Sequence, residues 1–178
     1  MEGRARAPAA GTVLNALATG TGSAFAIDAY TTATVELTDD EGVEGEIAGA
    51  PDADTRLIER CVELVVERFG DGQGGRVRTE SEVPMASGLK SSSAAANATV
   101  LATLAALDAR EEISREDACR IGVQAARDAG VTVTGAFDDA SASMLGGVTV
   151  TDNTEDELLT REERDWSVLV WTPPERSF

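Results

Sequence analysis

The chain passes from a predicted strand into a predicted helix through the stretch Val83-Pro-Met-Ala-Ser-Gly-Leu-Lys-Ser-Ser-Ser-Ala-Ala-Ala96. Residues 76–83 alternate between charged side chains and apolar or hydroxyl side chains, which indicates a strand with one buried face. Residues 92–107 are rich in Ala and Leu and contain neither Pro nor Gly, a composition typical of a stable helix. The sequence therefore predicts a strand, a loop and a helix in direct succession.

The loop between them has the composition of a phosphate site. Its small residues let backbone approach a ligand closely, and the free N–H groups at the start of a helix attract an anion. Ser91, Ser92 and Ser93 add hydroxyl groups. Lys90 is the only lysine, so 14 of the 15 basic residues are arginine. A helix that is merely capped needs one serine, so we favour phosphate binding over a plain cap.

The pattern of the loop excludes a Walker-type site and indicates another family. Leu89 separates Gly88 from Lys90, and no Gly stands five residues before Gly88. The pattern P-x-x-x-G-L-x-S-S-x-A over residues 84–94 resembles the ATP-binding loop of the GHMP small-molecule kinases. The longer string over residues 84–97, with Lys where most of that superfamily has Gly or Ala, resembles the archaeal shikimate kinases within it.

A second stretch with chemical potential runs from Thr132 to Gly147 and contains two adjacent carboxylates, Asp138 and Asp139. Phosphoryl transfer uses a carboxylate to orient or deprotonate the attacking hydroxyl, whereas a purely structural pair would serve the first turn of a helix. The stretch resembles the GHMP segment in which a Gly, a catalytic Asp and a Gly-Gly pair follow one another. The spacing from Gly135 favours Asp138 as the catalytic Asp, whereas the spacing back from Gly146-Gly147 favours Asp139. We prefer Asp138.

Residues 4–38 favour extended structure around a turn at Thr19-Gly-Thr-Gly22. Within them, residues 5–9 and 22–28 resemble the first GHMP motif, in which an N-terminal hairpin helps line the substrate pocket, and residues 12–20 resemble archaeal shikimate kinases. On that resemblance, Asn15 and Asp28 are candidate substrate-binding residues. As a turn residue and a strand-edge carboxylate they would need no ligand, and both interpretations stay open.

The remaining elements follow from local patterns. A helix over Asp54–Phe69 has apolar residues at helical spacing, and the glycine-rich run over residues 70–75 ends it. Ser114 is expected to start a helix that ends near Asp128, with Asp117 close to a capping-box position. We further predict short strands over 43–47 and 147–151, an acidic connector or short helix over 152–164, and a buried strand over 166–171.

Composition limits the partners and the environment. At 178 residues the chain can bury one core. A net charge of −17 argues against nucleic acid or an anionic membrane as partner. Such acidity with a single lysine is typical of a halophilic protein in concentrated salt, although an acidic protein of an ordinary cytosol shares the sign of the charge. The sequence has no long apolar run and no signal-peptide core, so we expect a cytoplasmic protein.

Cysteine and histidine usage narrows the chemistry. Cys61 and Cys119 lie far apart in helical patterns, which favours buried free thiols over a disulfide or a metal site. The chain has no His, which excludes a His-based triad and His-ligated metals.

The resemblance also implies a fold. It implies an α+β, two-layer α/β sandwich, the ribosomal protein S5 domain 2-like fold of GHMP kinase N-terminal domains, with a mixed sheet packed on helices. We expect residues 1–178 to form this ATP-binding domain and the C-terminal GHMP domain to be absent from the chain.

The function implied by the resemblance is transfer of the γ-phosphate of ATP to the 3-hydroxyl of shikimate, with Mg²⁺. The catalytic carboxylate would be Asp138 or Asp139, Lys90 would neutralise phosphate charge, and Ser92 would be the Mg²⁺ ligand. Alternatives are a GHMP kinase for homoserine or mevalonate and a nucleotide-binding domain without turnover. Arg4 or Arg6 is a candidate for the carboxylate of shikimate. The residues expected to hold ATP are Pro84, Met85, Ala86, Ser87, Gly88, Leu89, Lys90, Ser91, Ser92, Ser93 and Ala94.

Overall fold

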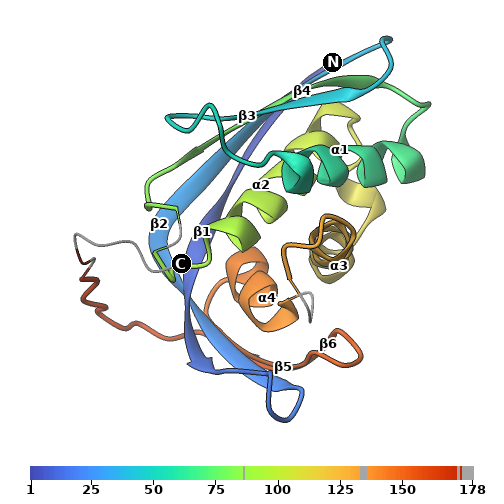
Figure 1. Cartoon of the computed structure of the whole chain (residues 1–178). Coiled ribbons are helices and arrows are strands. Elements are labelled where there is room, and N and C mark those ends of the chain that lie inside the picture. The colour runs from blue at the N-terminus through green and yellow to red at the C-terminus, as the bar shows by residue number, and fades with distance from the viewer. Residues whose placement is uncertain (86, 133–135, 172, 174–178) are drawn as a thin grey trace.

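The protein is described from a computed structural model, which covers residues 1–85, 87–132, 136–171 and 173. Within these residues it has two layers, a six-stranded sheet and a layer of helices on one of its faces (Figure 1). The strands are β1 (Glu2–Leu14), β2 (Thr21–Thr38), β3 (Val43–Ile47), β4 (Gly74–Ser81), β5 (Val148–Asp152) and β6 (Glu157–Glu162). The helices are α1 (Arg56–Phe69), α2 (Ser91–Ala106), α3 (Arg115–Asp128) and α4 (Phe137–Leu145), with a short 3-10 turn η1 (Arg110–Glu112).

The long strand β2 organises the sheet. It pairs antiparallel with β1 along one edge, while its other edge is shared between β4 and β5. β4 pairs with residues 31–38 of β2, and β5 pairs with residues 21–25. β3 adds to β4 in parallel and β6 adds to β5 antiparallel, so the sheet is mixed, as predicted. The loop after β4 and the strand after α4 therefore both meet the middle of β2.

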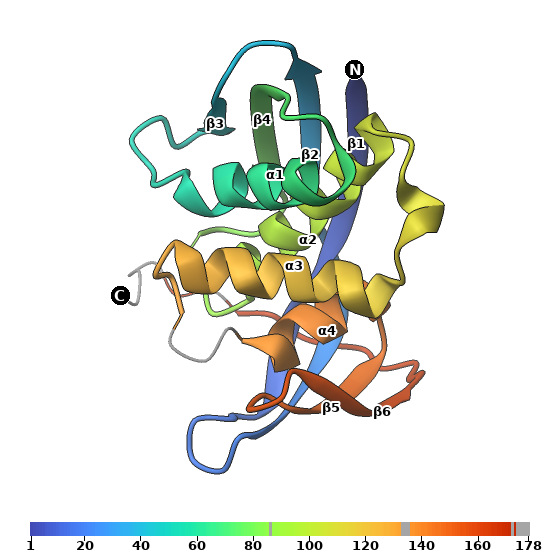
Figure 2. The same cartoon turned by 90° about the vertical axis from the view of Figure 1, so that its right-hand side faces the viewer.

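The helix α2 lies at the centre of the molecule. Figure 2 shows α1 and α3 nearest the viewer, with α2 behind them and the sheet behind α2. Most residues of α2 are buried, because the sheet and the other helices enclose it. A helix enclosed in this way needs small or apolar side chains on all sides. Small residues bring it close to β1: a Cβ atom built on Gly3 would lie 2.0 Å from the Ala102 carbonyl oxygen.

The core has two main parts. One lies among the helices and includes Leu104, Cys119 and Phe137, and the other lies between the helices and the sheet and includes Val35 and Val62. Both cysteines are free and buried, as predicted, and burial raises the pKa of the Cys61 and Cys119 thiols.

Most of the predicted elements are confirmed. The strand over Val43–Ile47 has the predicted bounds, and α1 ends at Phe69 before Gly70. Ser114 caps α3, because its Oγ accepts a hydrogen bond from the backbone N–H of Asp117 at 3.1 Å. Among the described residues, every helix is too short or too polar to span a lipid bilayer.

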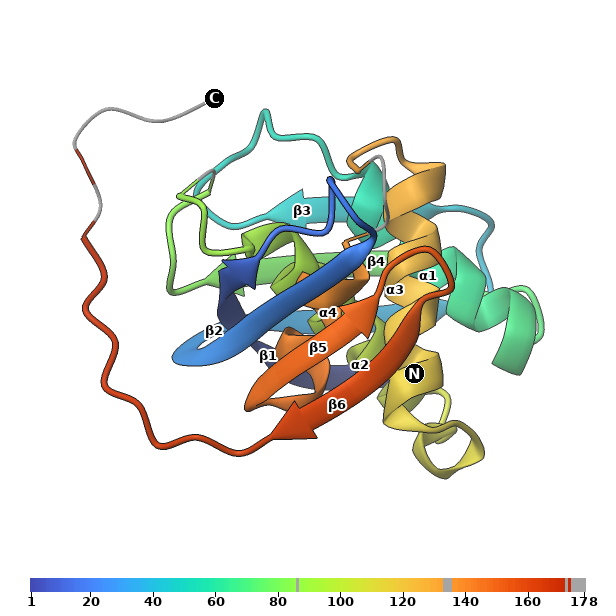
Figure 3. The same ribbon diagram turned by 90° about the horizontal axis from the view of Figure 1, so that it is seen from below.

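Two predictions near the C-terminus are wrong. The segment 152–164 contains β6, because its backbone pairs with β5 despite its polar side chains. Residues 166–171 do not form a buried strand: Leu169 is 96% exposed and Trp171 is 78% exposed. In Figure 3 this tail runs away from the sheet. A buried strand needs a paired neighbour, and within the described residues none pairs with this segment.

Candidate active site

Two helix N-termini meet at the site, and each begins after a residue in the left-handed conformation. Lys90, at the N-cap of α2, has φ 57° and ψ 42°. Ala136, at the N-cap of α4, has φ 53° and ψ 43°. This region costs roughly 1–2 kcal/mol for a residue with a Cβ atom, and such strain is concentrated at functional sites. Each of these two residues directly precedes the free N–H groups of a helix start.

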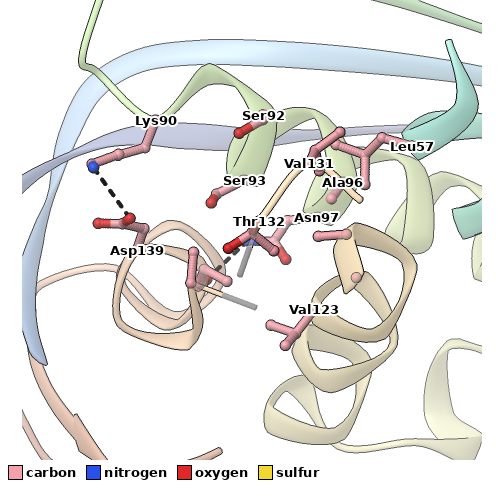
Figure 4. A pocket seen from close by; sticks show the side chains of 14 residues that line it. Leu57, Lys90, Ser92, Ser93, Ala96, Asn97, Val123, Val131, Thr132 and Asp139 are labelled. Atoms are coloured by element: carbon pink, nitrogen blue, oxygen red, sulfur yellow. Dashed lines mark hydrogen bonds and ion pairs between the residues drawn. The ribbon is translucent and has the colours of Figure 1, made fainter. Parts of the chain in front are cut away.

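An ion pair links these two helix starts. Lys90 Nζ lies 3.3 Å from Asp139 Oδ2, and Figure 4 shows the two side chains pointing toward each other among the residues that line a cavity. The Lys90 side chain is 32% exposed and that of Asp139 is 9% exposed. The other carboxylate oxygen, Oδ1 of Asp139, is buried and has no hydrogen-bond partner among the described residues. The carboxylate thus keeps one oxygen available to a proton or a ligand.

The surroundings of Asp139 raise the pKa of its carboxyl group. Its pKa is raised from 3.8 to about 6, first by burial and then by the charge of Asp138. Lys90 and the hydroxyl of Thr12 act in the opposite direction and lower the pKa. Burial therefore outweighs the ion pair, and the carboxylate is ready to accept a proton in the physiological range.

Asp138 is directed elsewhere. Asn153 Nδ2 donates a hydrogen bond to Asp138 Oδ1 at 3.0 Å. The same carboxylate lies against Gly22 of β2, where a Cβ atom would come within 2.6 Å of Asp138 Oδ2. Asp138 is absent from the lining of the cavity that contains Asp139. The adjacent carboxylates thus occupy different environments, one facing the cavity and one facing the sheet.

The cavity lies between α2, α3 and the start of α4, beside the predicted phosphate loop, with a volume of about 140 Å³. Its polar lining includes Lys90, Ser92, Ser93 and Asp139. Asn97 is fully buried there; its Nδ2 donates to the Ala140 carbonyl at 2.9 Å. Oδ1 of Asn97 has no partner among the described residues. The rest of the lining is Leu57, Ala96, Gly122, Val123, Ala126, Val131, Thr132, Ala136 and Ala140.

The predicted phosphate loop surrounds the start of α2. Pro84, Met85 and Gly88 are exposed, and Ser92 is exposed in the first turn of the helix. The Leu89 carbonyl accepts a hydrogen bond from the Ala10 backbone N–H at 3.1 Å, which ties the loop to β1. Ser87, Lys90, Ser91 and Ser93 are half-buried and Ala94 is buried. Ala86, and residues 133–135 of the second predicted stretch, lie outside the described residues.

The candidate substrate residues lie away from the cavity. Asn15 is exposed in the turn after β1, where its Oδ1 accepts a hydrogen bond from the Leu17 backbone N–H at 2.8 Å. Asp28 is exposed on β2. Neither lines the cavity, and their role in binding stays a prediction.

The two arginines offered for the substrate carboxylate lie on the open side of the sheet. The alternation of β1 places Arg4 and Arg6 opposite Ala5 and Ala7, which belong to the core beneath the helices. Arg6 stacks on the ring of Tyr30, 4.1 Å from its centroid. The structure gives no support to a role for these arginines at the Lys90 site.

Three site residues escaped the sequence analysis. Asn97 left a signal, because it is an amide within a run of alanines, but we gave it no role. Thr12 and Asn153 left none, since their contacts join distant parts of the chain.

Comparison with known proteins places this geometry in a family. The model of the GHMP kinases N terminal domain matches residues 56–147, which include the loop over residues 84–94 and both aspartates. The chain belongs to the GHMP kinase family.

The sequence of this GHMP kinase chain is similar to those of proteins named shikimate kinase. A protein of Halobacterium salinarum named shikimate kinase is 71% identical over 179 residues, which cover 100% of the chain and 63% of the relative. A shikimate kinase of Methanosarcina mazei is 55% identical and is covered to 60% of its length. The chain therefore spans less than two thirds of these relatives.

Solved GHMP kinase structures share the architecture. The crystal structure of homoserine kinase from Cytophaga hutchinsonii superposes with a TM-score of 0.74 at 20% identity, over 89% of this chain and 51% of that one. A mevalonate kinase gives a TM-score of 0.68 at 13% identity, over 91% and 56%. The α+β fold predicted from the sequence is confirmed.

Proposed function

We propose that residues 1–178 form the N-terminal ATP-binding domain of a shikimate kinase, which transfers the γ-phosphate of ATP to the 3-hydroxyl of shikimate. The observation that carries the proposal is the pairing of Lys90 with Asp139 between two helix N-termini. Helix N–H groups beside a carboxylate support this proposal, because phosphoryl transfer to a hydroxyl uses an anion site and a base. The choice of shikimate rests on the names of the relatives that are 71% and 55% identical.

In this proposal the loop over residues 84–94 holds the triphosphate. The N–H groups of the first turn of α2 would donate to phosphate oxygens, and the serine hydroxyls would add further donors. The ion pair between Lys90 and Asp139 would weaken when ATP binds. The ammonium group would then turn toward the γ-phosphate, where negative charge develops. Since the tether between Cα and Nζ is flexible, one lysine can serve both positions.

Asp139 is the better candidate for the base, although the sequence favours Asp138 on one count and Asp139 on the other. It faces the cavity, keeps a free Oδ1, and has a pKa of about 6. In the reaction the attacking hydroxyl loses its proton to Asp139 as its oxygen bonds to the γ-phosphorus. The bond from that phosphorus to the bridging oxygen breaks, and ADP leaves with the electron pair.

The residues present suit Mg²⁺. This ion prefers oxygen ligands and is commonly held by one or two protein groups together with substrate phosphates. Ser92 offers an exposed hydroxyl beside the phosphate site, and Asp139 offers the unpaired Oδ1. Within the described residues, no group of three or more His, Cys, Asp or Glu could hold a metal ion without a ligand's help. When bound, Mg²⁺ would offset charge on the phosphate oxygens.

The test is an assay of ADP release in molar KCl, with Mg-ATP and shikimate, homoserine or mevalonate as acceptor. It is run on the chain alone and on the chain joined to the part of the Halobacterium salinarum relative outside the match. We expect turnover with shikimate, a loss of about 10²–10⁴-fold in kcat for Asp139→Asn, and a smaller loss for Asp138→Asn.

The outcomes separate the alternatives. Turnover with homoserine or mevalonate instead of shikimate would change the proposed acceptor but leave the proposed roles of the site residues unchanged. ATP binding without transfer to any acceptor, in both proteins, would leave a nucleotide-binding domain and contradict the proposal. A larger loss for Asp138→Asn than for Asp139→Asn would reassign the base.

A further inference from the structure

We propose that Asn97 is a ligand-binding residue of this site, and that its side-chain Oδ1 accepts a hydrogen bond from an O–H group of the bound reactants. This O–H group belongs to a water molecule on Mg²⁺ or to a hydroxyl of the acceptor alcohol, which share the same hydrogen-bond chemistry. The inference deepens the proposed function and rests on it for the presence of Mg-ATP and an alcohol.

The contact between Asn97 and α4 fixes the orientation of its amide. Asn97 Nδ2 donates a hydrogen bond to the Ala140 carbonyl oxygen at 2.9 Å, and this bond joins α2 to α4 (Figure 4). A carbonyl oxygen can only accept, so the NH₂ group must face Ala140 and Oδ1 must point away from it. Because Asn97 also lines the cavity, its oxygen is the part of the amide that is left for a ligand.

The oxygen of Asn97 is buried and lacks a partner. The residue is 0% exposed, and no described residue donates a hydrogen bond to its Oδ1. Burying an amide oxygen without a donor costs free energy, whereas an apolar side chain of similar shape, such as leucine, would avoid that cost. We therefore expect the oxygen to gain a donor when the site is occupied.

The surroundings of Asn97 connect it to the proposed reaction. Ser93 lies one helical turn before Asn97 on the same face of α2, and both residues line the cavity. Asp139, whose Oδ1 is likewise buried without a partner in the described part of the chain, directly precedes Ala140. A cavity of about 140 Å³ has room for a few water molecules or for the hydroxyl end of a small ligand, since one water takes up roughly 30 Å³.

Hydrogen-bond chemistry selects which part of the reactants can pair with Asn97. Its Oδ1 can only accept, and the ionised oxygens of the triphosphate accept as well, so the phosphates are not its partner. The adenine amino group is a donor, but it lies at the opposite end of the nucleotide from the γ-phosphate. Two kinds of donor remain near the reacting atoms: the water molecules that Mg²⁺ keeps when it binds, and the hydroxyl groups of the acceptor.

The first arm of the test measures the metal complex without an acceptor, on the joined protein of the ADP-release assay. Mn²⁺ is the probe for Mg²⁺, and electron paramagnetic resonance in molar KCl gives its affinity in the presence of adenylyl imidodiphosphate. The affinity for the same nucleotide is also measured without metal. If Oδ1 pairs with a metal-bound water, Asn97→Ala should weaken Mn²⁺ binding by about tenfold and leave metal-free nucleotide binding nearly unchanged.

The second arm measures the acceptor without a nucleotide. Calorimetric titration with shikimate gives its affinity for the same protein. If Oδ1 pairs with a hydroxyl of the acceptor, Asn97→Ala should weaken shikimate binding by about tenfold and leave Mn²⁺ binding unchanged. Asn97→Leu keeps the volume of the side chain and removes the amide, so it should give the same losses as Asn97→Ala in whichever arm responds.

Two control variants on α2 separate ligand binding from packing. Thr99 Oγ1 is also buried without a partner among the described residues, but Thr99 does not line the cavity, so Thr99→Val should leave all the affinities unchanged. Val100→Ala removes core packing among the helices, outside the lining of the cavity. It should lower the stability and leave the affinities unchanged.

Unchanged affinities of the Asn97 variants in both arms would overturn the proposal. Equal losses for metal-bound and metal-free nucleotide, or the same losses in Val100→Ala, would overturn it too, because they would show that Asn97 acts only through packing. Both arms measure binding, and the first needs no acceptor. Absence of phosphoryl transfer in the ADP-release assay would therefore contradict the proposed function while the Asn97 test could still be read.

Discussion

Lys90 occupies a backbone position that suits glycine better than lysine. Its φ of 57° lies in the left-handed region, which residues with a Cβ atom avoid. In this chain the ammonium group lies 3.3 Å from Asp139 and lines the cavity, so the backbone strain accompanies the placement of this side chain.

This conflict can be measured by comparing two variants that both remove the ammonium group. We expect Lys90→Gly to be more stable than Lys90→Ala by about 1 kcal/mol, because glycine adopts positive φ without steric strain. Chemical denaturation in molar KCl gives the two free energies of unfolding. Equal or reversed values would show that the backbone relaxes and that no strain is stored at Lys90.

Asp139 should make the stability depend on pH in an unusual direction for an aspartate. Its pKa is raised from 3.8 to about 6, so the folded state disfavours the charged form. Its favourable contribution is complete below 3.8 and is lost as the pH rises through about 6. Asp139→Asn should therefore be more stable than the unaltered chain by about 2 kcal/mol at about pH 8, and nearly equal at about pH 4.

Denaturation curves at the two pH values test this, with Asp71→Asn as an exposed control. A variant that is less stable at the higher pH would mean that the ion pair with Lys90 outweighs burial, contrary to the direction of the pKa shift.

The sequence draws attention to Lys90 and the aspartate pair. It does not show which of the two carboxylates faces the cavity. Adjacent residues on a helix point about 100° apart, so only one of the two can face the cavity. Which one does so depends on Gly22 and Asn153, which lie more than one hundred positions apart in the sequence. No local pattern contains that information.

At the scale of elements, prediction succeeded where the signal was local. Ser114 and Gly70 mark a helix start and a helix end by their own chemistry, and both are confirmed. β6 was missed because its strand conformation comes from pairing with β5 rather than from its own composition. The tail over residues 166–171 has strand-forming residues, yet it lacks a neighbouring strand among the described residues. Composition gives the tendency of a segment, and a partner decides whether the strand forms.

The contact between β1 and α2 is a packing feature of elements that can be tested with two glycines. A Cβ atom at Gly3 would lie 2.0 Å from the Ala102 carbonyl oxygen and 2.5 Å from the Ala106 nitrogen, both backbone atoms. Gly3→Ala should therefore force β1 and α2 apart and destabilise the fold by about 1–3 kcal/mol.

Gly122 of α3 is the matched control. The nearest atom to a Cβ there is Ala96 Cβ at 3.4 Å, an ordinary contact. Gly122→Ala should be neutral or stabilise by up to about 1 kcal/mol, because alanine favours the helix. Thermal and chemical denaturation of the two variants give the comparison. Similar effects of both substitutions would contradict close packing of β1 on α2.

At the scale of the whole molecule, the basic side chains balance only part of the negative charge. Arginines pair with acidic side chains across β3 and β4, as in Arg76 with Glu44 and Arg78 with Glu46. Arg60 joins α1 to α3 through Asp128 at 2.8 Å. The pairs of Arg76 and Arg78 are exposed, and exposed pairs contribute little each. With 32 acidic and 15 basic residues, most of the acidic excess is left to repel itself.

The net charge of −17 predicts that salt stabilises the fold. Raising the KCl concentration from about 0.1 M to about 1 M shortens the screening length from about 10 Å to about 3 Å, which is less than the spacing of most surface charges. The repulsion then weakens more than the short ion pairs do, so the free energy of unfolding should rise with KCl. Neutralising the exposed acids Asp71, Glu111 and Glu112 to their amides should raise the stability in low salt and flatten its dependence on KCl. Replacing KCl by sulfate at equal ionic strength separates screening from stronger burial of apolar surface. If the stability does not change with KCl, or the triple variant keeps the full dependence, self-repulsion is not what limits this fold in dilute buffer.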